Sequence, residues 1–241
     1  MNLILFDTND IRADATVDAT GVQARHLITV LKVTPGQQVR IGVIDGSTGV
    51  GTVTSIGDGR VTMDCAFEAD PPERPRVDLL LALPRPKVMR RLWAQLSALG
   101  VGQVILTNAS KVERDYFDTH LLEPNGYRPL LLEGLQQARD TRVPVVSVHK
   151  QFRKLIEADL DGLFPEGRRL VADPNGQGSI ADTLGRSTER VLLAVGPEGG
   201  WNNFELSLLQ AHRFTPVTMG TRTLATTTAC IALLALVHHR G

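Results

Sequence analysis

The chain has 241 residues, of which 42% are hydrophobic and 22% charged, and its 26 basic and 26 acidic residues give a net charge of zero. These values are typical of a globular protein and exclude a disordered one, while a neutral total is compatible with a local basic face that binds nucleic acid. Two cysteines, Cys65 and Cys230, predict neither a disulfide framework nor a metal site. The apolar segments at the N-terminus and at residues 229–237 are too short for a signal peptide or a membrane span, so we expect a cytoplasmic protein. We expect no metal, because the sequence has no cluster of cysteines and histidines at zinc spacing.

Residues 1–70 have the pattern of a small β-barrel. Apolar segments at residues 39–44, 50–56 and 60–67 alternate with the turn signals Asp45-Gly46 and Gly57-Asp58-Gly59, which favour hairpins. One helix is expected over residues 22–33, with Leu27, Val30 and Leu31 on one face. Prolines and charges then gather at residues 71–76, which predicts a linker.

Residues 77–241 alternate between strand and helix patterns. The alternation predicts an α/β domain with a mostly parallel sheet covered on both faces. The expected strands are residues 77–83, 101–107, 143–148, 168–172, 191–195 and 215–219. The expected helices are residues 88–99, 127–139, 180–184, 203–212 and 226–239.

The apolar strand at residues 191–195 ends abruptly in Gly196-Pro197-Glu198-Gly199-Gly200. Glycines let a backbone approach another backbone or a ligand closely. Asn202 and Glu205 have the spacing of a capping pair for the next helix. Local chemistry leaves two interpretations open, a tight strand-to-helix turn without a ligand and a cofactor loop at a strand's carboxyl end.

Five segments in order resemble the RsmE family, SPOUT-class methyltransferases that modify N3 of a uridine in small-subunit ribosomal RNA. The resemblance covers nearly the whole chain, and the Gly196–Gly200 segment is its most specific part. Two of the other segments lie before residue 102: Arg25-His26-Leu27 with Val30-Leu31-Lys32 and Gly36, and Pro86-Lys87 with Leu99-Gly100-Val101. The remaining two are Glu133 with Gln137 and Arg142-Val143-Pro144, and Met219–Leu224 with Thr228-Ala229.

The resemblance implies a PUA-like N-terminal β-barrel that grips RNA and a C-terminal SPOUT domain, residues 77–241, with a trefoil knot. It also implies a homodimer that binds S-adenosylmethionine and methylates 16S rRNA during ribosome biogenesis. The residues expected to bind the cofactor are Leu170, Val171, Ala172, Val195, Gly196, Pro197, Glu198, Gly199, Gly200, Met219, Gly220, Thr221, Arg222 and Leu224.

The chain also departs from the family at charged positions. Ala225-Thr226-Thr227 stands where the family carries Arg-x-Glu, and Gln95 and Ala98 replace a lysine and a glutamate. These changes leave two alternatives open: a SPOUT enzyme with a different RNA target, and a catalytically inactive RNA-binding paralogue.

Two side chains are candidates for catalysis. Arg222 could bond O2 or O4 of the uracil or a flanking phosphate, or it could form a salt bridge that fixes its loop. Glu198 could orient the cofactor or act as a base, or it could serve as a capping carboxylate.

Basic side chains are candidates for contact with the RNA backbone, although those scattered over the N-terminal domain could equally form an ordinary solvated face. They are Arg25, His26, Lys32, Lys87, Arg90, Arg91, Arg114 and Arg142, with Lys111 beside them. Arg142 and Gln137 could instead shape the nucleotide side of the pocket or the dimer seam. The helix at residues 226–239 is apolar on several faces, which suits either a core or a subunit interface.

Overall fold

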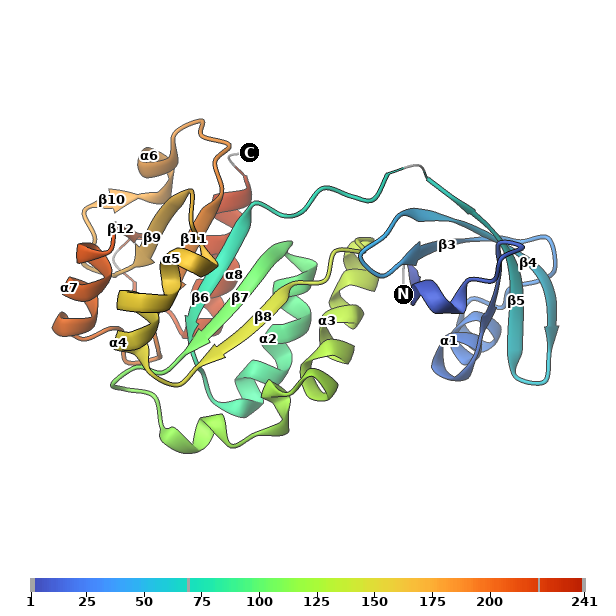
Figure 1. Cartoon of the computed structure of the whole chain (residues 1–241), viewed down its shortest axis with the longest axis horizontal. Helices are drawn as coiled ribbons and strands as arrows, with labels where there is room; N and C mark the ends of the chain where they lie inside the picture. Colours follow the sequence, from blue (N-terminus) through green and yellow to red (C-terminus); the bar gives the residue numbers. More distant parts are fainter. Residues whose placement is uncertain (1–2, 69, 221, 240–241) are drawn as a thin grey trace. The chain divides into compact units, whose positions relative to one another are not determined.

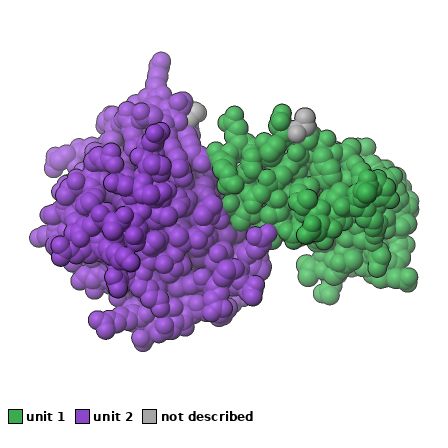
Figure 2. Space-filling model, viewed as in Figure 1, with its two compact units in different colours: residues 1–74, 132–143 green, residues 75–131, 144–241 purple. Residues whose placement is uncertain are grey.

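The computed structural model describes residues 3–68, 70–220 and 222–239. Contacts divide the chain into an N-terminal unit, Met1–Arg74 with Leu132–Val143, and a C-terminal unit, Pro75–Leu131 with Pro144–Gly241 (Figure 2). The change between the units at residues 74 and 75 falls within the predicted linker. No sequence pattern had indicated that residues 132–143 group with the N-terminal unit.

The N-terminal unit is built on a five-stranded sheet with the order β1-β3-β4-β5-β2. β1 and β3 are parallel, and the other neighbours are antiparallel. Asp58 and Gly59 both have positive φ, +50° and +69°, in the tight turn between β4 and β5, as a hairpin with right-handed twist requires. The strands are β1 (Ile4–Phe6), β2 (Thr16–Ala19), β3 (Gln38–Val43), β4 (Thr48–Gly57) and β5 (Arg60–Phe67).

The helix of this unit differs from the prediction. It consists of α1 (Gly21–Arg25) and a π-helical turn over His26–Val30. The wider turn changes the helical phase, so that Leu27 is buried while Val30 and Leu31 are 63% and 40% exposed. The expectation that these three side chains share one buried face is therefore wrong.

Residues 132–143 are anchored to the N-terminal unit by packing and hydrogen bonds. Leu135, near the end of α3 (Pro124–Ala138), is buried against Leu3 and Leu5. The Thr141 hydroxyl donates to the carbonyl of Gly46 over 2.6 Å. The Arg142 guanidinium donates to the carbonyls of Pro72 and Asp45 over 2.6 and 2.9 Å, which gives this predicted RNA-binding residue a structural role in its own unit.

The C-terminal unit contains a seven-stranded parallel sheet with the order β10-β12-β9-β11-β6-β7-β8. Every residue of β6 and β11 is buried, because central strands of a parallel sheet are covered on both faces. The strands are β6 (Val77–Ala82), β7 (Val101–Thr107), β8 (Val145–His149), β9 (Arg168–Ala172), β10 (Gly178–Ser179), β11 (Val191–Val195) and β12 (Phe214–Thr218).

Helices lie on both faces of this sheet, with α2 and α8 behind it and α4 and α5 in front of it in Figure 1. α2 begins at Pro86, a favourable first position because proline's missing N–H would have no partner there. Its buried Trp93 donates its indole N–H to the carbonyl of Leu121 over 3.1 Å. The helices are α2 (Pro86–Ala98), α4 (Phe152–Lys154), α5 (Leu160–Leu163), α6 (Ile180–Leu184), α7 (Asn203–Ala211) and α8 (Thr226–His238).

The predicted fold class is confirmed: an N-terminal β unit precedes an α/β unit with a parallel sheet. The strands at residues 168–172 and 191–195 have the predicted bounds, and β12 begins one residue earlier than expected. The sequence did not predict β1, β2 or the helical segment between β8 and β9. Among the described residues, no helix is both long and apolar enough to cross a membrane.

Candidate functional site

Three loops form a cavity of about 460 Å³ at the carboxyl edge of the parallel sheet. They follow β9, β11 and β12, which are neighbours in the order β12-β9-β11. Because parallel strands end at the same edge, segments far apart in the sequence meet around one space, at residues 173–175, 196–201, 218–220 and 222–224. This edge is where open α/β sheets bind their ligands.

The loop after β11 is shaped by its glycines and by Trp201. Gly200 has a φ of +69° and donates its N–H to the carbonyl of Pro197 over 2.8 Å, closing a tight turn. A Cβ at Gly196 would lie 3.1 Å from Nε1 of Trp201, so this position has no room for a side chain unless the indole moves. Trp201 is buried, and its indole nitrogen has no hydrogen-bond partner among the described residues. The indole nitrogen is thus packed against the backbone at Gly196, and Trp201 contributes a buried aromatic ring to the cavity wall.

The predicted capping pair at the start of α7 is confirmed. The side chain of Asn202 accepts from the N–H of Glu205, and the carboxylate of Glu205 accepts from the N–H of Asn202, both over 2.8 Å. Glu205 is also buried and accepts from the N–H of Ser110 over 2.6 Å. This carboxylate thus joins the loop after β7 to the loop after β11.

A second link joins the same two loops. The ammonium group of Lys111 donates to the carbonyl of Gly199. A Cβ at Gly199 would lie 2.6 Å from Cδ of Lys111, so a larger residue here would displace the lysine side chain. Lys111, a candidate RNA contact from its sequence, therefore has a partner within the loop that lines the cavity.

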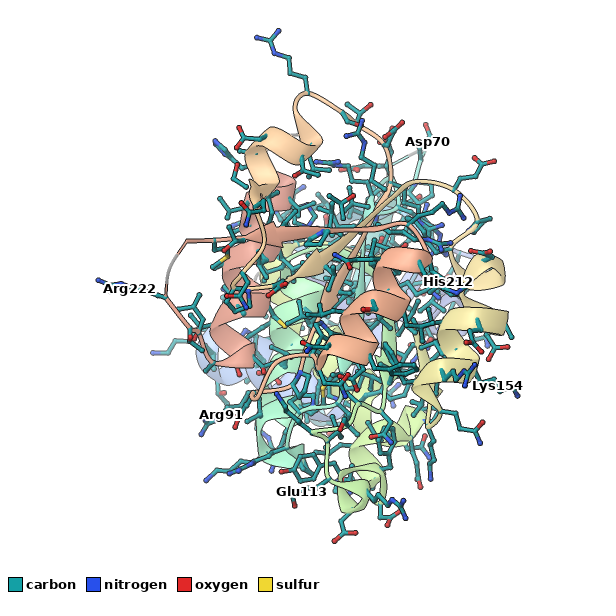
Figure 3. All side chains as sticks on the ribbon, turned by 90° about the vertical axis from the view of Figure 1, so that its left-hand side faces the viewer. Asp70, Arg91, Glu113, Lys154, His212 and Arg222 are labelled. Atoms are coloured by element: carbon teal, nitrogen blue, oxygen red, sulfur yellow. The ribbon has the colours of Figure 1, made fainter. Side chains whose placement is uncertain are left out.

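Charged side chains are sparse in the cavity. Glu198 and Arg222, the two catalytic candidates, both line it and are exposed. Figure 3 shows the Arg222 side chain pointing away from the ribbon. Asp173 also lines the cavity, and its carboxylate accepts from the N–H of Asn175 over 2.9 Å, which shapes the loop after β9. The sequence had not indicated Asp173.

Most of the expected cofactor residues lie around this one cavity. Leu170 and Val171 do not line it, because their side chains are buried within β9. Thr221 lies outside the described residues. The list of expected cofactor residues lacked Trp201, at the end of the glycine-rich loop, and Leu206 and Leu233 on the helices, although the apolar side chains of all three line the cavity. The expected residues that line it are Ala172, Val195, Gly196, Pro197, Glu198, Gly199, Gly200, Met219, Gly220, Arg222 and Leu224.

The expected RNA-contacting residues are distributed over both units. Lys87, Arg90 and Arg91 are exposed on α2, while Arg114 lines a different cavity after β7. Arg25 and Lys32 are exposed in the N-terminal unit. His26 is partly buried, and this burial lowers the pKa of its imidazole, which favours the neutral ring at pH 7.

Comparisons with known proteins agree with this arrangement. A family model described as the RNA methyltransferase domain matches residues 71–238, and one described as the RNA methyltransferase PUA domain matches residues 19–63. The first match alone covers more than half of the chain. The chain belongs to the RNA methyltransferase family. The resemblance stated from the motifs is thereby confirmed.

Relatives with this family's fold match over almost their whole length. Ribosomal RNA small subunit methyltransferase E of Treponema pallidum is 28% identical, covering 98% of this chain and 90% of that protein. A second relative, ribosomal RNA small subunit methyltransferase E 1 of Borreliella burgdorferi, is 23% identical, covering 96% of this chain and 95% of that protein.

Solved structures show the same fold. The Neisseria gonorrhoeae ribosomal RNA small subunit methyltransferase E, bound to S-adenosylmethionine, superposes with a TM-score of 0.79 at 20% identity, covering 99% of this chain and 97% of that one. A Legionella pneumophila methyltransferase with bound S-adenosylmethionine gives a TM-score of 0.79 at 19% identity, covering 100% and 98%.

This member of the RNA methyltransferase family lacks charge at the start of α8. Ala225 is exposed and Thr227 is partly buried, at the positions where the motif led us to expect arginine and glutamate. Between them, the hydroxyl of the buried Thr226 donates to the carbonyl of Gly196 over 3.3 Å. The start of α8 thus contacts the glycine-rich loop through a hydrogen bond between uncharged groups.

Proposed function

We propose that the protein is an S-adenosylmethionine-dependent methyltransferase that methylates N3 of a uridine in 16S ribosomal RNA. The observation that carries this proposal is the cavity formed by the loops after β9, β11 and β12, with Gly196–Gly200 as one wall. The family membership supports the reaction class, and the names of the relatives support the small-subunit ribosomal RNA as the substrate.

The residues present fit this cofactor. The cavity volume of about 460 Å³ lies in the range of small-molecule sites, and backbone and apolar side chains form most of its wall. The carboxylates of Asp173 and Glu198 favour a cation in the cavity. Bound there, S-adenosylmethionine would supply a methyl group on a positively charged sulfur.

The chain's own residues would prepare the uracil. N3 becomes a nucleophile when its proton leaves, and the negative charge then spreads to O2 and O4. Arg222 is assigned to stabilise that charge by hydrogen bonds from its guanidinium, because it is the one cationic side chain among the described residues that line the cavity. Glu198 is assigned to orient the cofactor or to accept the proton.

The remaining features of the family belong to this proposal too. We assign the chain a trefoil knot in the C-terminal unit, a homodimeric state and a cytoplasmic location. α8 supports the dimer, because its Leu236 is 44% exposed although the helix also packs a buried apolar face of Cys230, Leu233, Leu234 and Val237. The exposed basic residues of α2 are assigned to the RNA backbone.

The test combines two measurements on the purified protein. Isothermal titration calorimetry with S-adenosylmethionine is expected to show binding, and labelled methyl groups are expected to pass to small ribosomal subunits or 16S rRNA. Cofactor binding without transfer to either would favour a different RNA target, in line with Ala225 and Thr227. Absence of cofactor binding would leave the RNA-binding paralogue.

A further inference from the structure

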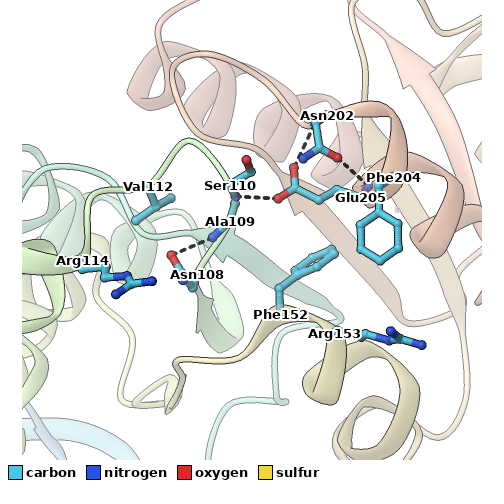
Figure 4. Close-up of a pocket in the computed structure, with 10 residues that line it drawn as sticks. All are labelled: Asn108, Ala109, Ser110, Val112, Arg114, Phe152, Arg153, Asn202, Phe204 and Glu205. Atoms are coloured by element: carbon cyan, nitrogen blue, oxygen red, sulfur yellow. Dashed lines mark hydrogen bonds between the residues drawn. The ribbon is translucent and has the colours of Figure 1, made fainter.

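A second cavity, of about 390 Å³, lies at the same edge of the sheet. Its lining comes from the loops that follow β7, β8 and β11, whereas the cofactor cavity uses the loops after β9, β11 and β12. The loop after β11 therefore separates the two spaces. Figure 4 shows the second cavity with Phe152 and Phe204, Asn108 and Asn202, and Arg114 and Arg153 around it.

The wall between the cavities is aromatic. Trp201 lines the cofactor cavity, and Asn202 lines the second one. The ring of Phe152 packs against Trp201 with 5.4 Å between the ring centroids, so these two rings form a continuous partition. The two rings therefore lie between the cofactor cavity and the second cavity.

Two carboxamides of the second cavity have their oxygens engaged by backbone donors, beside the hydroxyl of Ser110 and the carboxylate of Glu205. The side-chain oxygen of Asn108 accepts from the N–H of Ala109, and that of Asn202 accepts from the N–H of Glu205. Because backbone donors fix both oxygens, each side chain presents its amide NH₂ as its remaining polar group. Glu205 is buried, and both its carboxylate oxygens accept backbone N–H groups.

Two arginines add positive charge to these donors. Arg114 is exposed beside the cavity, and Arg153 forms a salt bridge through its Nε with Glu157 over 2.8 Å, which offsets part of its charge. A ligand that suits this lining has several acceptor oxygens and a negative charge. A phosphate and the carbonyls of a nucleobase provide both.

The aromatic side chain of Phe204 completes this chemistry. It is 57% exposed at the start of α7, and in Figure 4 it lies on the same side of the cavity as Arg153, across from Arg114. An exposed ring beside cationic side chains is the usual platform for a base of single-stranded nucleic acid, since every base has a flat face that can stack.

We propose that the second cavity binds a nucleotide that neighbours the target in a single-stranded segment of the RNA, with its base on Phe204 and a phosphate near Arg114 or Arg153. This inference rests on the proposed function for the nature of the substrate. β9 and β7 are three strand positions apart in the sheet, a separation of about 15 Å at the usual strand spacing. A few nucleotides of one strand can span it.

The test measures RNA affinity by fluorescence anisotropy with a labelled, uridine-rich 12-nucleotide RNA. Phe204→Ala is expected to weaken binding about ten-fold or more, the scale of one lost base stack, and Phe204→Trp is expected to restore it. Arg114→Gln is expected to weaken binding several-fold and to lower the salt dependence by about one phosphate contact. Lys154→Gln, an exposed charge next to Arg153 that does not line the cavity, is the matched control and is expected to bind like the unaltered protein.

Calorimetry with S-adenosylmethionine accompanies each variant and is expected to give unchanged affinity, which also shows that the variants fold. RNA affinity within two-fold of the unaltered protein in both Phe204→Ala and Arg114→Gln would overturn the proposal, as would equal weakening in Lys154→Gln. Uridine monophosphate that displaces RNA at matching concentrations would assign the cavity to a free nucleotide instead. If RNA affinity depended on Phe204 but no methyl group were transferred, the proposed function alone would be contradicted. If methyl groups were transferred but the Phe204 and Arg114 variants bound RNA like the unaltered protein, this inference alone would be contradicted.

Discussion

The two cavities on either side of the Gly196–Asn202 loop are built by different means. The cofactor cavity is formed mainly by the backbone of glycine-rich loops, and its charged side chains are few. The second cavity is formed by side chains, two rings, two carboxamides and two guanidinium groups, which come from three separate loops. The shape of the cofactor cavity depends on glycines, which lack side chains, and the shape of the second cavity depends on the side chains that line it.

This difference determines which changes should affect each cavity. A small added group should close a backbone-built site, whereas a side-chain-built site should lose affinity by truncation. The loop between them should transmit changes to both. The following predictions test these statements in order of expected effect.

Gly196→Ala should abolish most cofactor binding. The added Cβ would lie 3.1 Å from the Trp201 indole nitrogen and 3.2 Å from two of its carbons, so the buried ring must move into the cavity or the loop must shift. We expect S-adenosylmethionine affinity to fall at least about 100-fold, roughly 3 kcal/mol, by calorimetry. Gly162→Ala is the matched control, because nothing lies within 4 Å of its added Cβ. Equal affinity of the two variants would contradict a backbone-built site.

Asp78 should make the sheet beneath both cavities sensitive to pH. Asp78 is fully buried in β6, where its Oδ2 lies 2.6 Å from Nη2 of Arg190. Burial nevertheless raises the pKa of its carboxyl group from 3.8 to about 6. The folded protein then holds a proton more tightly than the unfolded chain, so this group's contribution to stability is lost as pH rises from about 4 to 6. The free energy involved is about 2 to 3 kcal/mol.

Asp78→Asn removes that titration. The difference in urea-unfolding free energy between the variant and the unaltered protein should change by about 2 kcal/mol between pH 4 and 6 and stay constant above it. Both cavities rest on this sheet, so their ligand affinities should keep their ratio. If the difference in unfolding free energy between the variant and the unaltered protein stayed constant from pH 4 to 6, Asp78 would not titrate in this range.

Glu205→Gln should destabilise the loop that separates the cavities. The carboxylate accepts from two backbone N–H groups, and an amide would turn one acceptor into a donor that faces one of them. Such a buried mismatch costs about 2 kcal/mol of unfolding free energy. Gln210→Ala, exposed on the same helix, should change it by less than about 0.5 kcal/mol. Urea unfolding measures the free energy of unfolding of both variants. Equal losses in Glu205→Gln and Gln210→Ala would show that Glu205 does not link the loops.

Lys111→Met should have the smallest effect and should affect both cavities together. It removes the ammonium that donates to the Gly199 carbonyl but keeps an unbranched side chain that reaches to the ε position. The contact is exposed, so we expect affinities for S-adenosylmethionine and for RNA to fall only about three-fold each. Loss of RNA affinity alone would mean that Lys111 acts as a phosphate contact instead of a loop clamp.

The same difference explains what the sequence could predict. Residues 196–200 and 219–224 belong to linear motifs, so the family resemblance could lead us to expect a cofactor site in these segments, although the glycines alone left a tight turn equally open. Buried strands such as β11 were predictable because parallel sheets leave long apolar segments. Asn202 and Glu205 were predictable because helix capping acts over three residues.

The remaining features depend on contacts between distant residues. Phe152 and Phe204 are 52 positions apart in the chain, and no periodicity connects them. Leu135 had a helical pattern, but that pattern could not show its packing on Leu3 and Leu5. Val30 and Leu31 were misplaced because a π-helical turn changes the phase that a regular helix predicts.

The identity of the methylated product tests the central claim most directly. The purified protein is incubated with S-adenosylmethionine and small ribosomal subunits or 16S rRNA that lack the modification, and the rRNA is digested and its nucleosides separated by liquid chromatography with mass spectrometry. The account predicts 3-methyluridine at one position, and its amount should fall sharply with Gly196→Ala and remain unchanged with Gly162→Ala. A different methylated nucleoside, or none while calorimetry shows bound cofactor, would contradict it.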